Sequence, residues 1–539
     1  MKLGSDANTT RDGHWWQRGI IYQVYPRSFQ DTDGDGVGDL PGILSRLDHF
    51  RWLGVDAVWI SPFYPSPMAD FGYDVTDHTA VHPLFGTLAD FDRLLEAAHE
   101  RDLRVILAYV PNHTSDRHPW FVESRSSREN PKRDWYIWRD AAPGGGPPNN
   151  WRSAFGGSAW TREAATGQYY LHTFLREQPD LNWRNPRVEA TMLDVMRFWM
   201  DRGVDGLRVD AVQNVIKDEH FRDNPPNPEH GPGDDPFDVL LRVHSGDRPE
   251  IHEVIARMRR LVDEYPDRAL IGEIYNKVER LMPYYGVEGR GCHFPYNFQL
   301  IKLPWDARTI DAAIRRYEAL LPPGAWPNWV LGNHDRMRIA SRVGESQARV
   351  AAMLLFTLRG TPTLYYGDEI GMKNVPIPPE QVRDPWEKNL PGRGLGRDPV
   401  RTPMQWSGAA GAGFTTGTPW LPIADDLRSI NVEAQRHDPH SLLSLHRRLI
   451  ALRRREPALQ LGGYEPVDAD GSVLAYIRGL GGDRFLVALN LGAGPRVLEI
   501  EHEGRVVLST RPAREREGQV VRGTLDLGAD EGVILRLMV

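Results

Sequence analysis

The sequence predicts an α/β protein built on a (β/α)₈ barrel. Three short apolar runs, each with a carboxylate at or near its end, carry this prediction: 204–212 (VDGLRVDAV), 269–274 (ALIGEI) and 329–335 (WVLGNHD). Each run suits a strand of a parallel sheet that is buried on both faces. The C-terminal ends of barrel strands meet at one face, where active sites form. We therefore expect Asp210, Glu273 and Asp335 to converge there.

Arg208 and Asp210 lie two residues apart on the first of these runs, so their side chains point to the same side of the strand. A buried strand tolerates such a pair only if the charges are paired or used. Two interpretations stay open, a structural ion pair and an ionised nucleophile held by a guanidinium. Glu273 follows apolar residues with no adjacent cation, so we expect its pKa to rise toward the working pH.

Composition favours a protein of several domains that binds small molecules. The chain has 539 residues, 17 of them Trp, and its net charge of -8 gives no support to nucleic-acid or membrane binding. Trp rings suit stacking on sugars, although most are expected in the core. Cys292 is the one cysteine, and residues 1–16 lack a signal-peptide pattern. We expect a cytoplasmic monomer or homodimer without an organic cofactor.

The remaining barrel elements follow in chain order. Strands are expected at 19–26, 55–61, 103–110, 292–294 and 362–367, and helices at 41–53, 91–101, 188–201, 251–264, 348–358 and 441–454. Two long polar connections, 217–247 and 372–406, are expected to form walls of the site.

The amino-acid composition and the predicted secondary-structure pattern change twice along the chain. Residues 114–180 are rich in Trp, Pro, Gly and Asn, which predicts a small domain inserted after the third strand. Residues 456–539 contain short strand patterns separated by Gly-rich turns, which predicts a C-terminal antiparallel β-sandwich. The barrel would then comprise residues 1–113 and 181–455.

An acidic loop follows the first expected strand. Its carboxylates, Asp31, Asp33, Asp35 and Asp39, alternate with glycines. Carboxylate and carbonyl oxygens are the ligands that Ca²⁺ and Mg²⁺ take, so the loop predicts a structural cation. The alternative is an Asx-rich turn whose charges are solvated.

The motifs resemble a known family. Asn112-His113, Gly206–Asp210, Gly272-Glu273 and Asn333–Asp335 look like four conserved regions of the α-amylase superfamily, glycoside hydrolase family 13, and Gln178–Asn182 looks like its fifth. Arg401–Trp406 (RTPMQW) and the acidic loop resemble its α-glucosidase and oligo-1,6-glucosidase branch.

The resemblance implies a role for each matching residue. Asp210 would be the nucleophile, Glu273 the general acid/base, and Asp335 the stabiliser of the transition state. The glucose site would be formed by Tyr73, Asp74, His113, Arg208, His334 and Arg401, with Asp74 and Arg401 closing its non-reducing end. The metal would be held by Asp31, Asp33, Asp35, Asp39 and the carbonyl of Val37.

The implied activity is a retaining, exo-acting α-glucosidase that removes one glucose from a short α-glucoside such as maltose or sucrose. A glucosyl-enzyme forms on Asp210, and water or a sugar hydroxyl then takes the glucose. Alternatives are an oligo-1,6-glucosidase, an isomerase or glucosyltransferase acting on sucrose or trehalose, and, outside enzymes, an inactive amylase-like scaffold. Retention of all three acids argues against the last.

Two positions depart from the family or leave specificity open. The first conserved region normally opens with an Asp that supports the arginine, but here Ala108 stands at that place. Arg208 is therefore expected to find another acceptor or to work less well. After the nucleophile, relatives tend to carry Val for α-1,6 bonds and Thr for maltase activity. Ala211 decides neither.

Overall fold

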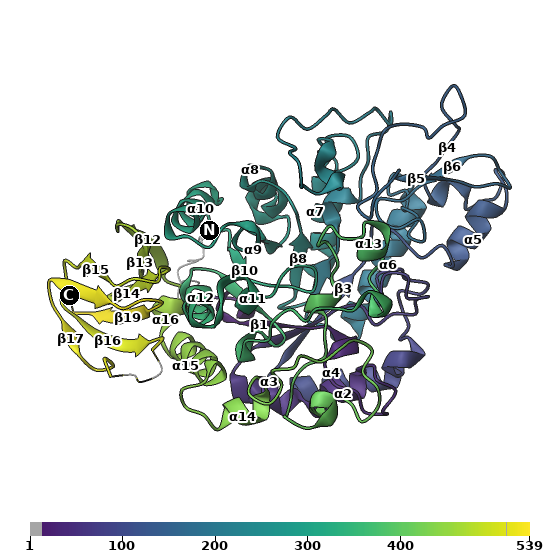
Figure 1. The fold of residues 1–539 in the computed structure, drawn as a ribbon. Helices are drawn as coiled ribbons and strands as arrows, with labels where there is room; N and C mark the ends of the chain where they lie inside the picture. The colour runs from purple at the N-terminus through teal and green to yellow at the C-terminus, as the bar shows by residue number, and fades with distance from the viewer. Residues whose placement is uncertain (1–12, 512, 514, 539) are drawn as a thin grey trace, which may run out of the picture.

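The computed structural model describes residues 13–511, 513 and 515–538, and it confirms the predicted barrel (Figure 1). Eight parallel strands pair in the order β10-β11-β1-β2-β3-β7-β8-β9. In chain order they are β1 (Ile21–Val24), β2 (Ala57–Ile60), β3 (Arg104–Tyr109), β7 (Gly206–Val209), β8 (Ala269–Glu273), β9 (Phe294–Tyr296), β10 (Asn328–Val330) and β11 (Thr361–Tyr365). β9 contacts β10, which closes the cylinder.

Almost every residue of these strands is buried, as expected for a parallel sheet covered by helices. The covering helices include α4 (Leu88–His99), α6 (Pro186–Asp201), α7 (Ile251–Val262), α10 (Ala307–Leu320), α12 (Glu345–Thr357) and α15 (Leu442–Arg455). Each turns an apolar stripe inward, and most begin at a capping side chain, such as Thr87 before α4 and Asn185 before α6.

Two elements differ from the sequence prediction. The expected helix at 41–53 is two helices, α2 (Leu40–Ser45) and α3 (Leu47–Leu53), which meet at Arg46. The strand expected at 292–294 begins later, because the Cys292 N–H is bonded to the Tyr284 carbonyl in the preceding turn. Both differences are local and leave the barrel order intact.

A small three-stranded sheet lies between β3 and β7 in the chain, ordered β4 (Trp138–Arg139), β6 (Tyr169–Leu171), β5 (Trp160–Arg162), beside helix α5 (Pro119–Ser126). A buried ion pair ties this segment to the barrel. Lys217 Nζ lies 2.7 Å from an Asp180 oxygen and donates to Asn112 Oδ1 at 2.6 Å. The pair fixes the end of the inserted segment against the loop that follows β7.

The C-terminal part is antiparallel and lies at the opposite end of the molecule from β4–β6 (Figure 1). A six-stranded sheet has the order β12 (Gly463–Val467), β13 (Val473–Leu480), β14 (Asp483–Asn490), β19 (Gly532–Leu537), β16 (Gly504–Ser509), β17 (Val520–Val521). A ribbon of β15 (Arg496–Glu499) and β18 (Thr524–Leu527) packs on one of its faces through a separate apolar core. The other face meets α12 and α16 (Pro457–Gln460).

Two buried arginines lie at the junction between this sheet and the barrel. Arg478 on β13 donates to the carbonyls of Thr357, Leu459 and Gly462, which end α12 and α16. Arg453 on α15 donates to the carbonyl of Phe356, in the last turn of α12, and to that of Leu358, directly after the helix. These donors satisfy C-terminal carbonyls that a helix cannot pair by itself.

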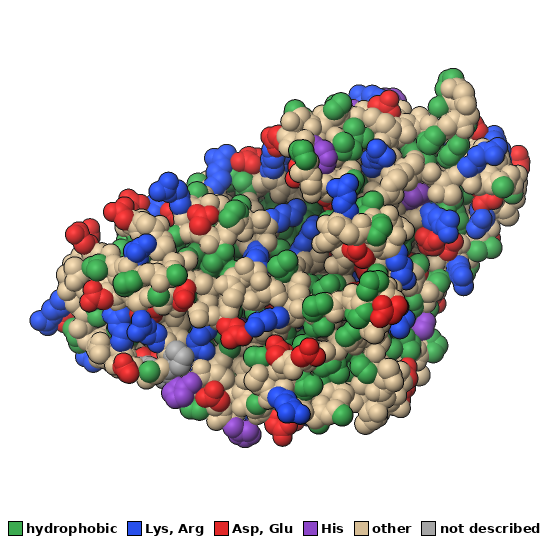
Figure 2. Space-filling view, viewed as in Figure 1, with side chains coloured by type: hydrophobic (Ala, Val, Ile, Leu, Met, Phe, Trp, Pro, Cys, Tyr) green, Lys and Arg blue, Asp and Glu red, His purple; other side chains and the backbone are tan. Residues whose placement is uncertain are grey.

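The surface mixes both charge signs. In the face shown in Figure 2, Lys and Arg side chains are interspersed with Asp and Glu over the barrel and the C-terminal sheet. Among the described residues, no helix is both long and apolar enough to cross a membrane.

Candidate active site

A cavity of about 150 Å³ opens at the C-terminal ends of the barrel strands. It brings together six of the side chains singled out from the sequence. They are Tyr73, His113, Asp210, Glu273, His334 and Asp335. Their loops are far apart in the chain, and the parallel register of the strands places them at one edge.

Arg208 lies beneath this cavity and bridges the two acids on neighbouring strands. One of its terminal nitrogens, Nη1, contacts Asp210 Oδ1, and the other, Nη2, contacts Glu273 Oε1. Glu273 also accepts a hydrogen bond from the Ala211 N–H at 2.9 Å. The expectation that Glu273 has no adjacent cation was therefore wrong, because strand pairing brings Arg208 to it from β7.

The two acids also influence each other directly. Both carboxyl groups contact the same guanidinium and line the same cavity, so their charges are close neighbours. Burial and then the negative charge of Glu273 raise the pKa of Asp210 well above its usual range, while Arg208 opposes the rise. One guanidinium cannot offset two buried negative charges, so the pair favours holding one proton between them.

Asp335 is held in the opposite state. Arg401 Nη2 donates to its Oδ1 at 2.8 Å, and Arg397 Nη1 lies 3.4 Å from the same oxygen. Burial alone would raise the pKa of Asp335, but the adjacent His334 ring and the charges of Arg401 and Arg397 outweigh burial and lower this pKa below its usual range. Asp335 is therefore a fixed anion at the cavity wall.

The two histidines are neutral hydrogen-bonding groups. Burial lowers the pKa of His113 to about 4 and that of His334 to about 3. His334 is fixed by Gln23 at 2.8 Å and by the Tyr73 hydroxyl at 2.9 Å, and its ring stacks on Tyr73. Tyr73 therefore packs on a histidine as well as lining the cavity.

The structure does not place Asp74 or Arg401 in the cavity wall. Asp74 is fully buried, and its carboxylate accepts hydrogen bonds from Ser66, Ala69 and Asp70 within its own loop. Arg401 lies behind Asp335, where its Nε donates to the His334 carbonyl at 2.8 Å.

Two residues that were not predicted from the sequence, Asp70 and Arg397, line the cavity wall instead. Asp70, four residues before Asp74, accepts from Arg397 Nη2 at 2.7 Å and from Gln178 at 3.2 Å. Asp384 holds the same guanidinium at 2.6 Å. Two features of the sequence could have pointed to them. Asp70 is a second acid in the loop of Asp74, and Arg397 is a second arginine shortly before Arg401.

Ala108 leaves one atom of Arg208 without a partner. Ala108 is the residue paired with Arg208 between β3 and β7. The guanidinium lies 4.9 Å from the centre of the Trp59 ring, and its Nε is buried with no hydrogen-bond acceptor among the residues that the structure describes. The acceptor that the family resemblance would supply from position 108 has no replacement.

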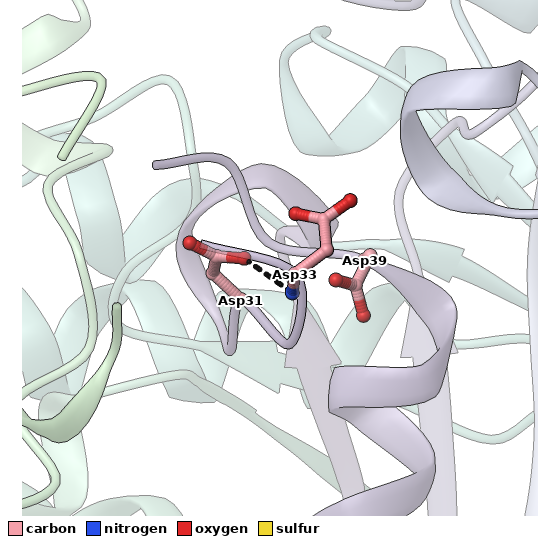
Figure 3. A group of neighbouring side chains, drawn as sticks. All are labelled: Asp31, Asp33 and Asp39. Atoms are coloured by element: carbon pink, nitrogen blue, oxygen red, sulfur yellow. Dashed lines mark hydrogen bonds between the residues drawn. The ribbon is translucent and has the colours of Figure 1, made fainter. Parts of the chain in front are cut away.

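The acidic loop brings three of its carboxylates together. Asp31, Asp33 and Asp39 offer oxygens that all lie within 4.8 Å of one another (Figure 3). Asp35 lies outside this group, and its carboxylate accepts from the Val37 N–H at 2.7 Å. Asp31 also accepts from loop N–H groups, such as that of Gly34 at 2.8 Å. Hard oxygen donors at this spacing fit a small divalent cation.

The fold and these acids place the chain among known enzymes. Residues 23–462 match the model of the alpha-amylase catalytic domain. The chain belongs to this family of glycoside hydrolases.

Particular relatives narrow the comparison. A probable alpha-glucosidase of Rhizobium meliloti is 43% identical, with 89% of this chain and 90% of the relative covered. An oligo-1,6-glucosidase of Halalkalibacterium halodurans is 39% identical, with 92% and 93% covered. Among solved structures, an alpha-glucosyl transfer enzyme superposes with a TM-score of 0.93 at 42% identity, covering 98% of this chain and all of the other. A trehalulose synthase of Pseudomonas mesoacidophila superposes with a TM-score of 0.89 at 35% identity, again covering 98% of this chain and all of the other.

Restoring an acid at position 108 tests the unpaired nitrogen. We expect Ala108→Asp to accept from Arg208 Nε, to hold the guanidinium in its bridging position, and to raise kcat on 4-nitrophenyl α-glucoside several-fold. Ala108→Val, which adds bulk without a hydrogen-bond acceptor, is the control. Equal kcat for the wild type and both variants would show that the missing acceptor does not limit turnover.

Proposed function

We propose that the protein is a retaining, exo-acting α-glucosidase that removes glucose from the non-reducing end of short α-glucosides. The observation that carries this is the contact of Asp210 with Glu273 through one guanidinium. Retaining enzymes hold their carboxyl groups about 5–5.5 Å apart, whereas inverting enzymes leave room for a water between them. Two acids that contact the two terminal nitrogens of one guanidinium are close neighbours, which supports the retaining geometry.

The proposed reaction has two steps. Asp210 attacks the anomeric carbon as Glu273 gives its proton to the glycosidic oxygen, and the aglycone leaves. A β-glucosyl ester on Asp210 remains. Glu273, now ionised, then takes a proton from water or from an acceptor hydroxyl, whose oxygen attacks the same carbon. Transfer to a sugar hydroxyl would form a new α-glucoside by the same step.

The protonation states support these roles. The acid pair favours holding one proton, which is what a nucleophile and a general acid need together. A bound glucoside would present its glycosidic oxygen to Glu273 and so favour the proton there. Asp335 stays ionised beside its two arginines, so it would accept hydrogen bonds from sugar hydroxyls and stabilise positive charge developing at the anomeric carbon.

The substrate end of the cavity supports exo action. We propose that Asp70 and Arg397 close the glucose site and bind the hydroxyls of the terminal sugar, the role first expected of Asp74 and Arg401. Both side chains line the cavity, and both are almost fully buried. A longer chain could not pass beyond such a wall.

A sucrose or trehalose isomerase is the second candidate, because trehalulose synthase structures superpose closely on this chain. The same glucosyl-enzyme would serve, but the released sugar would be recaptured through another hydroxyl. Product analysis separates the two activities.

A substrate panel with an active-site trap tests the main proposal. We expect maltose, isomaltose, sucrose or trehalose to release glucose, and Glu273→Gln to lower kcat on maltose-type substrates about 10²–10⁴-fold. A slow 5-fluoroglucosyl fluoride should leave a covalent adduct, located by peptide mass spectrometry on Asp210. Conversion of sucrose to an isomer in place of glucose would favour the isomerase, and an adduct elsewhere would refute the assigned nucleophile.

The closed end of the site gives a second prediction. Asp70→Asn removes a charge that holds Arg397 and binds sugar, so kcat/KM for maltose should fall about 100-fold, or about 3 kcal/mol. Asp74→Asn is the control. It should lower the melting temperature, because it weakens three buried hydrogen bonds, and leave kcat/KM nearly unchanged. A large fall in kcat/KM for Asp74→Asn, with little change for Asp70→Asn, would instead support Asp74 as the residue that binds the terminal sugar.

We also propose that Asp31, Asp33 and Asp39 hold a structural Ca²⁺ or Mg²⁺. Chelation should lower the melting temperature, and added cation should restore it, because a ligand that binds the folded state stabilises it. Asp33→Asn should abolish the response, whereas Asp35→Asn should retain it. A melting temperature that is indifferent to chelator would favour the solvated turn.

A further inference from the structure

The outer part of the catalytic cavity is lined by three cations from three different loops. Arg242 belongs to the long connection after β7, Lys302 ends α9 (Gln299–Lys302), and Arg336 directly follows Asp335. All three line the same cavity as the catalytic acids and are less buried than Asp70 and Arg397, so they lie toward its open end. They are separate from the arginines that hold the acids.

The three cations differ in their partners. Arg242 forms an ion pair with Asp238 at 3.5 Å. In the described part of the chain, neither Lys302 nor Arg336 forms an ion pair. Asp235 lies nearby, but its carboxylate accepts from the Phe237 N–H at 3.0 Å as a helix cap.

Tyr275 gives the two unpaired cations a common position. Lys302 Nζ lies 5.0 Å from the centre of its ring and the Arg336 guanidinium carbon 5.8 Å. The same ring is stacked on Phe298, with ring centres 4.0 Å apart. Arg336 Nε is also buried without a hydrogen-bond partner. Both positive groups are therefore held at the cavity wall by packing.

In this part of the cavity the three cations face two acids, Asp235 and Asp238, so the local charge balance is positive by one. Desolvation at the wall, and then the neighbouring charge of Arg336, lower the pKa of Lys302 to about 8. A lysine in a balanced ion-pair network would keep its proton more firmly. The deeper arginines contrast with this, because Arg208, Arg397 and Arg401 each contact a carboxylate.

We propose that this subsite selects α-glucosides whose aglycone carries an anionic group, a carboxylate or a phosphate monoester. The anion would lie between Lys302 and Arg336, beside Tyr275, and would supply the partner that both cations lack. Arg242 would add a longer-range attraction that Asp238 largely offsets. This inference rests on the proposed glucosidase function for its position relative to the scissile bond.

The experiment compares two nearly isosteric substrates, 4-carboxyphenyl and 4-carbamoylphenyl α-glucoside, which differ by one charge. A second pair, maltose with and without a phosphate on O6 of its reducing glucose, tests the phosphate. We expect kcat/KM of the wild type to favour the anionic member of at least one pair about tenfold or more at low salt, with the ratio falling as salt is added.

Variants assign the preference to its residues. Lys302→Gln and Arg336→Gln should each lower the anionic-to-neutral ratio at least about threefold, and the double variant should bring it near one. Arg308→Gln, an exposed arginine on α10, is the matched control and should keep the wild-type ratio. A wild-type ratio at or below one for both pairs, or a ratio that the double variant retains, would overturn the proposal.

A binding measurement separates this proposal from the proposed function. Calorimetric titration of Glu273→Gln with both pairs reads the preference for an anion without turnover. Absence of cleavage of all four glucosides by the wild type, with the anionic preference retained in binding, would refute the glucosidase and support the anion subsite. Cleavage of all four, with no preference for the anion in either measurement, would support the glucosidase and refute the anion subsite.

Discussion

The guanidinium of Arg208 between Asp210 and Glu273 is the interaction on which the site depends. Two carboxyl groups this close and this buried repel each other when both are ionised, and one shared cation keeps them together at a moderate cost. The arrangement needs two neighbouring parallel strands, because only pairing of β7 with β8 brings residues 63 positions apart to one arginine. The barrel is thus a requirement of the chemistry as well as its support.

Much of the fold and of the site could be predicted from the sequence. Apolar runs that end in acids predicted the barrel strands, and changes in amino-acid composition and pattern indicated the inserted segment and the C-terminal sheet. The predictions failed where long-range pairing decides the outcome. The apolar run 269–274 that contains Glu273 has no cation, yet Arg208 reaches this acid from the neighbouring strand. No local pattern records that neighbour.

A local cause explains why Asp70, and not Asp74, lines the cavity wall. Both acids lie in one loop, and either could have faced the sugar. Asp74 is used to bind three donors of its own loop, and burial raises its pKa to about 6, so it shapes the loop that presents Asp70. A local hydrogen-bond pattern of this kind depends on the turn geometry, which residue types alone do not determine.

Arg478 also limits how the chain can be divided. Its guanidinium closes the carboxyl ends of α12 and α16, although it belongs to a strand of the C-terminal sheet. Excising that sheet would remove the donor from the Thr357 and Gly462 carbonyls at the ends of both helices. We therefore expect the barrel and the sheet to unfold in one melting transition, because each contributes to the stability of the other.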